Sequence, residues 1–63
     1  MKKITNWKEL EKIEARIEEE NWKMVENGKE VEDVEDLFWL YDEELILKED
    51  KANKTYTVKN WER

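Results

Sequence analysis

The chain contains neither cysteine nor histidine in its 63 residues, which removes the disulfides and zinc sites that usually stabilise folds of this size. A domain so short buries only about 60% of the surface that its unfolded chain exposes. Large apolar side chains must therefore hold it together. The four Trp, two Tyr and one Phe suit that role, because each aromatic ring buries on the order of 150–250 Å². We expect one compact domain over residues 1–63.

The segment 6–20 has the pattern of an amphipathic helix. Asn6 is a good N-cap, and Glu9 follows three residues later, where a capping box requires it. Apolar side chains then recur at helical spacing on one core-facing stripe: Trp7, Leu10, Ile13 and Ile17. Ile4 precedes the cap and fits either a short strand or simple packing on the helix.

Residues 21–31 allow two interpretations. The pair Asn27-Gly28 is a strong signal for a type I′ hairpin turn, because both central residues of that turn need positive φ. Asn-Gly also ends helices, so an extension of the first helix is the alternative. A continued helix would spread its apolar residues over more than one face. We therefore favour strands at 22–26 and 29–32.

A second helix is predicted over residues 33–42. Asp33 can cap its N-terminus, and Asp36 adds a carboxylate to the first turn, where the helix dipole favours one. One face of this helix is apolar and carries Val34, Leu37, Phe38 and Tyr41. Trp39 and Leu40 project sideways from that face.

The segment 44–61 is predicted to form a β-hairpin around the loop 51–54. The register that follows is Asp50 with Thr55, Glu49 with Tyr56, Leu47 with Val58 and Leu45 with Asn60. Both strands then agree on one apolar face, and a slip of one residue would destroy that agreement. The predicted fold class is α+β, with two helices and a small antiparallel sheet that includes this C-terminal hairpin.

The second hairpin resembles a known one. Its residues Asp50-Lys51-Ala52-Asn53-Lys54-Thr55-Tyr56-Thr57-Val58 are similar to the last hairpin of the immunoglobulin-binding B domains of streptococcal protein G. The stretch from Trp22 to Val31, with its Asn-Gly-Lys turn, resembles their first hairpin more weakly. The order of elements departs from that family, because a long helix comes before the first hairpin here. The resemblance implies hairpin geometry and does not carry antibody binding to this chain.

The composition excludes most catalytic chemistry. Without Ser, Cys or His there is no conventional nucleophile–base pair, and one Gly cannot form a phosphate-binding loop. We expect no enzyme, no cofactor and no metal site. The net charge of −6 argues against binding nucleic acid or an anionic membrane. With no long apolar run and no signal peptide, a cytoplasmic location is expected.

The order of the charges points to a partner. Ten acidic residues and one base lie between positions 30 and 50, while lysines prevail near both ends of the chain. One interpretation is a solvated face balanced within the fold. The other is an acidic patch that binds a protein with a basic surface. The candidate partner-binding residues are Trp39, Glu32, Glu35, Asp36, Asp42 and Glu43.

Three functions are compatible with this sequence. The first is a protein-binding module or inhibitor that acts by covering a partner's surface. The second is a DNA mimic that inhibits a nucleic-acid-binding protein, and the third is a stable fold without biochemical activity. A homodimer is a further option, because a short sheet has edges to cover. The absence of Ser, Gln, Pro, His and Cys fits both a computed miniprotein and a small phage-type protein.

Overall fold

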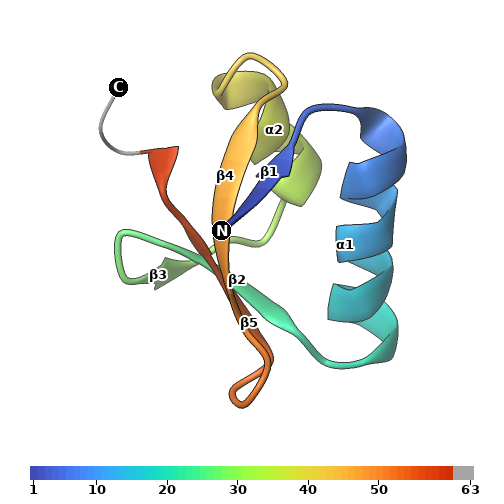
Figure 1. Cartoon of the computed structure of the whole chain (residues 1–63), viewed down its shortest axis with the longest axis vertical. Helices are drawn as coiled ribbons and strands as arrows, with labels where there is room; N and C mark the ends of the chain where they lie inside the picture. The colour runs from blue at the N-terminus through green and yellow to red at the C-terminus, as the bar shows by residue number, and fades with distance from the viewer. Residues whose placement is uncertain (61–63) are drawn as a thin grey trace.

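Two helices pack on one face of a five-stranded sheet (Figure 1). The computed structural model of the protein describes residues 1–60. In chain order the elements are β1 (Lys2–Ile4), α1 (Trp7–Glu19), β2 (Lys23–Glu26), β3 (Lys29–Glu30), α2 (Val34–Leu40), β4 (Leu45–Asp50) and β5 (Thr55–Val58). The predicted α+β class is confirmed.

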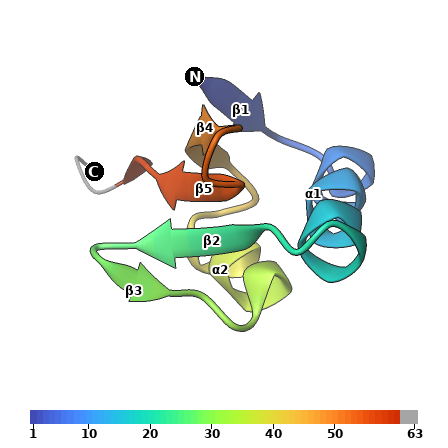
Figure 2. The same ribbon diagram turned by 90° about the horizontal axis from the view of Figure 1, so that it is seen from below.

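The sheet is mixed, so the expectation of an antiparallel sheet is wrong. Its strand order is β1-β4-β5-β2-β3 (Figure 2). Strand β5 lies in the middle, antiparallel to β4 and parallel to β2. The parallel pair arises because β3, α2 and β4 form a crossover between β2 and β5, and only such a long connection can join parallel strands.

The first helix forms where the capping signals place it. The Asn6 carboxamide oxygen accepts a hydrogen bond from the backbone N–H of Glu9 at 3.0 Å. The Asn6 amide in turn donates to the Glu9 carboxylate at 2.9 Å. At its other end the helix stops at Glu19, and Asn21, with φ of 62°, redirects the chain. Ile4 belongs to a short edge strand and is fully buried.

The hairpin interpretation of residues 21–31 is confirmed, but both strands are shorter than predicted, because β2 begins at Lys23 and β3 ends at Glu30. Strands β2 and β3 pair antiparallel, with Val25 opposite Glu30. Between them Asn27 and Gly28 both have positive φ, 50° and 80°, as a type I′ turn requires. The alternative, an extension of the first helix through these residues, is wrong, because the positive φ of Asn21 already ends the helical path of the backbone.

The second helix is shorter than predicted. Asp33 caps it by accepting a hydrogen bond from the backbone N–H of Asp36 at 3.1 Å. The helix ends at Leu40, and Asp42 and Glu43 both adopt positive φ. The N–H of Glu43 then donates to the carbonyl of Phe38 at 2.8 Å, which folds the chain back under the end of the helix.

Strands β4 and β5 pair in the predicted register between Leu47–Val58 and Asp50–Thr55. The predicted pair Leu45–Asn60 is replaced by a side-chain contact. The buried Asn60 carboxamide accepts from the N–H of Ile46 at 2.7 Å and donates to the carbonyl of Glu44 at 3.1 Å. Asn60 therefore extends the ladder through its side chain. The last predicted residue of this hairpin, position 61, lies outside the described residues.

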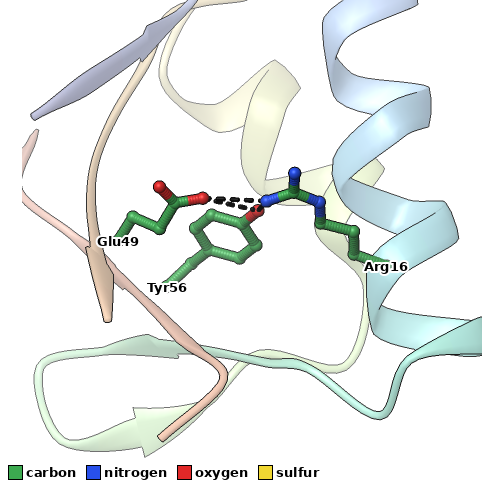
Figure 3. A network of polar contacts seen from close by, with 3 residues as sticks. All are labelled: Arg16, Glu49 and Tyr56. Carbon is green, nitrogen blue, oxygen red and sulfur yellow. Dashed lines mark hydrogen bonds and ion pairs between the residues drawn. The ribbon is translucent and has the colours of Figure 1, made fainter. Parts of the chain in front are cut away.

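Tyr56 occupies the centre of the core. It is fully buried and stacks on Trp22 with a ring-centroid distance of 4.6 Å. Its hydroxyl accepts a hydrogen bond from Arg16 of α1 at 2.7 Å, and the same guanidinium pairs with Glu49 of β4 at 2.8 Å (Figure 3). Burial raises the pKa of the Tyr56 phenol, although Arg16 acts in the opposite direction. The cluster joins α1 to the two central strands of the sheet.

The two bonds of Asn60 give a stability prediction. Replacement of Asn60 by Ala leaves the N–H of Ile46 and the carbonyl of Glu44 without their partner, so we expect the free energy of unfolding to fall by about 1–3 kcal/mol. Urea denaturation measures this loss. Asn53→Ala is the control, because the Asn53 side chain donates one hydrogen bond, to the Asp50 carboxylate at 2.8 Å, in an exposed turn where water can replace it. Equal losses in the two variants would contradict the role given to Asn60.

Candidate functional site

Helix α2 exposes two large apolar side chains at consecutive positions. Trp39 keeps 60% of its surface exposed and Leu40 keeps 70%. Residues three and four apart lie next to each other on a helix, so Glu35 and Asp36 border this pair one turn earlier. Asp42 and Glu43 follow at the end of the helix and are also exposed. We call these six residues the α2 ridge: Glu35, Asp36, Trp39, Leu40, Asp42 and Glu43.

Trp39 is held in place by other aromatic rings. Its ring lies 5.8 Å from that of Trp7 at the start of α1, and Trp7 packs edge-on against the buried Phe38 at 5.1 Å. Trp7 itself is 36% exposed, so it extends the apolar surface toward α1. A side chain supported in this way loses little conformational freedom on binding, which favours its use as an anchor.

A groove runs along the other side of the ridge. It has a volume of about 540 Å³ and lies between α2 and the β2–β3 hairpin. Leu37, Leu40 and Val31 provide its apolar lining. Four carboxylates and one base also line it, and they are those of Glu26, Glu30, Asp33, Asp36 and Lys29. The groove can accept an apolar side chain of a partner whose neighbouring groups are basic.

The acidic residues at the C-terminal end of α2 interact unfavourably with the helix dipole. The carbonyl groups exposed there carry partial negative charge, which favours bases and disfavours carboxylates. The last turn of α2 contains no base, and Asp42 and Glu43 follow it directly. Both also adopt positive φ, which non-glycine residues rarely do. Helix electrostatics and backbone preference thus both disfavour acidic residues at these two positions.

Five of the six candidate residues come together on the α2 ridge, and Glu32 does not. Glu32 lies before α2 and lines a second groove of about 310 Å³ that runs between the two helices. The sequence did not indicate that Leu40, or the β2–β3 side of the first groove, belongs to the site. The sequence did show Leu40 off the apolar stripe, but only the strand order places β3 beside it.

Two carboxylates approach each other where the helices meet. Glu14 of α1 is half-buried and lies beside Glu35 of α2. Burial raises the pKa of Glu14, and repulsion from Glu35 raises it further. Glu18 and Glu11 on the same helix add to that repulsion. At neutral pH this contact between two charged groups therefore opposes the packing of α2 on α1.

Within residues 1–60, no three acidic side chains are grouped closely enough to hold a metal ion. No helix in the same part of the chain is long and apolar enough to cross a bilayer. Comparison with known proteins finds no matching family, no matching curated sequence and no matching solved structure. The resemblance to the protein G B domains thus rests on the residues of the two hairpins alone.

The Glu14–Glu35 contact predicts a dependence of stability on pH. The folded state holds a proton on Glu14 up to a higher pH than the unfolded state does, because burial and then repulsion from Glu35 disfavour its charged form. The charged Glu14 therefore costs stability above that range, and the cost is relieved as the pH falls. Glu14→Gln should therefore be more stable than the parent chain at neutral pH. The difference in unfolding free energy should shrink as Glu14 becomes protonated in acid.

Urea denaturation of both chains at neutral and at acidic pH measures this difference. Glu19→Gln is the matched control, because Glu19 is exposed at the far end of α1 and shows no such contact. A difference between Glu14→Gln and the parent that stays constant with pH would contradict the interpretation.

Proposed function

We propose that the protein is a non-enzymatic binding module that covers a basic, partly apolar surface of another protein with its α2 ridge. The observation that supports this proposal is the exposure of Trp39 and Leu40 at consecutive positions of α2, at 60% and 70%. Elsewhere among the described residues, most large apolar side chains are buried. A supported Trp is the side chain most often found at the energetic centre of an interface.

The charges define the chemistry of the partner. Carboxylates surround Trp39 and Leu40, so the complementary surface has an apolar centre and a rim of lysine or arginine. Charges at such a rim affect mainly the rate of association and the choice of partner, while the apolar anchors contribute most of the affinity. The ridge therefore fits occlusion of a basic surface better than capture of a small molecule.

A defined probe tests this proposal. A synthetic amphipathic peptide of leucine and lysine presents an apolar face with a basic rim. Titration of the isotopically labelled protein with this peptide should shift the backbone NMR signals of residues 33–43 first. Trp39→Ala with Leu40→Ala should weaken binding by at least about tenfold, which corresponds to the loss of one anchoring side chain.

Charge reversal separates the ridge from the overall charge of the chain. Glu35→Lys with Asp36→Lys should weaken binding of the peptide and slow its association. The matched control is Glu19→Lys with Glu20→Lys, which makes the same change in net charge at the far end of α1. If the control weakens binding as much as the ridge variant does, the peptide responds to net charge and the proposed surface is wrong.

The same titration distinguishes the proposed binding module from a DNA mimic. A mimic depends on the spacing of its carboxylates, so loss of Trp39 and Leu40 would leave its binding intact while added salt would abolish it. Binding that depends on the two apolar side chains supports the module proposed here. Binding whose affinity is unchanged by loss of the two side chains, and depends only on the salt concentration, would favour the DNA mimic.

A further inference from the structure

The β2–β3 turn places an asparagine directly before the one glycine of the chain. Asn27 and Gly28 are both exposed, and they occupy the two central positions of the turn. Neither the Asn27 side chain nor the Gly28 N–H forms a hydrogen bond with another of residues 1–60. The carboxamide and the N–H that follows it are therefore both in contact with water.

These two neighbouring groups can react with each other. The carboxamide carbon of an asparagine, Cγ, lies within reach of the backbone nitrogen of the next residue. Attack by that nitrogen forms an N–Cγ bond, which closes a succinimide ring, and breaks the Cγ–Nδ2 bond. The amide nitrogen leaves as ammonia with the proton that the backbone nitrogen loses. Water then opens the ring at one of its two carbonyl carbons.

The residue after the asparagine decides how freely the nitrogen can attack. A side chain there crowds the nitrogen, and glycine has none. Beyond its two chain neighbours, Gly28 has no protein atom within 4 Å of the place where a Cβ would stand. Water and hydroxide can therefore reach the nitrogen and the ring carbonyls.

The other four asparagines lack this combination. Asn6 and Asn53 hold their carboxamides in hydrogen bonds with nearby carboxylates. Asn60 is buried, and both ends of its carboxamide are bonded. Asn21 is exposed, but the large side chain of Trp22 follows it and crowds the attacking nitrogen. The reaction should therefore be fastest at Asn27.

The turn has to open before the ring can close, because a type I′ turn holds the Asn27 backbone in one conformation. The place of the turn in the fold makes this opening easy. Strand β3 is an edge strand of two residues, Lys29 and Glu30, and both are exposed (Figure 2). Such a segment can open locally while the core stays folded.

We propose that Asn27 is a site of spontaneous deamidation, with the Gly28 nitrogen as nucleophile and water as co-reactant. Opening of the ring at Cγ gives aspartate. Opening at the main-chain carbonyl gives isoaspartate, in which the backbone continues through Cγ. This inference goes beyond the proposed function, because the reaction needs no partner and uses no residue of the α2 ridge.

The two products affect the fold differently. Asn27 lines the groove beside α2, so each product adds a carboxylate to a lining that already contains four. Isoaspartate also adds one atom to the backbone of a turn whose geometry depends on two positive φ angles. We expect this longer backbone to weaken the hydrogen bond from the N–H of Val31 to the carbonyl of Met24, which measures 2.8 Å in the unmodified chain.

Incubation of the parent chain in mildly alkaline buffer at physiological temperature tests the proposal. Peptide mapping by mass spectrometry should show loss of the Asn27 amide at least about tenfold faster than at Asn53, a difference of about 1.4 kcal/mol in activation free energy. Asn53 is the internal reference, because it also lies in an exposed turn but precedes a lysine. Mildly acidic buffer should slow the reaction, because the attacking nitrogen must lose its proton.

Variants separate the chemistry from its consequence. Asn27→Gln should suppress the reaction, because the longer side chain has to close a larger ring. Asn53→Gln is the matched control and should leave the rate at Asn27 unchanged. Asn27→Asp carries the added carboxylate without the longer backbone. Amide hydrogen exchange at Val31 should therefore be faster in the isoaspartyl chain than in this variant.

Equal rates at Asn27 and Asn53 in the parent chain would overturn the proposal. So would an Asn27 amide that persists in the folded chain but is lost in urea, since the turn would then protect it. Unchanged exchange at Val31 in the isoaspartyl chain would contradict the expected effect on the hairpin. The time series on the parent chain stands even if a variant fails to fold, and none of these results depends on binding of the leucine–lysine peptide.

Discussion

Strand β5 lies between β4 and β2, and the rest of the fold depends on its pairing with both. Without it, β1 with β4 and β2 with β3 would be two separate ribbons, and isolated two-stranded ribbons are at best marginally stable in water. Tyr56 of this strand adds the side-chain links. It stacks on Trp22, and its hydroxyl meets both Arg16 and Glu49. One central residue thus connects α1, β2 and β4 in a chain that has no covalent cross-link.

The sequence predicts those parts of the fold that local chemistry decides. The cap of Asn6 with Glu9, the turn at Asn27-Gly28 and the register of β4 with β5 all depend on residues close together in the chain. The parallel pairing of β2 with β5 and the edge position of β1 do not. Each joins segments about thirty or more residues apart, and no short pattern specifies which distant strand will be the neighbour. The role of Asn60 is missed for a different reason, because a side chain there replaces a backbone bond.

The candidate site is predictable to a similar extent. Trp39 stands off the apolar stripe of its helix, and that alone marks it as exposed. Glu32 has the same charge as its neighbours but belongs to another groove, since the loop before α2 turns it toward α1.

The central place of β5 has a consequence for the speed of folding. Chain segments that pair early in most small folds are near neighbours, whereas here β1 pairs with β4 and β2 with β5 across about half of the chain or more. The entropy of closing these loops is lost before the contacts form, so folding slows as the mean sequence separation of contacts rises. We therefore expect the domain to fold more slowly than a helical bundle of the same length. Its two helices can form early, but they gain a common surface to pack on only after β5 has paired with β4 and β2.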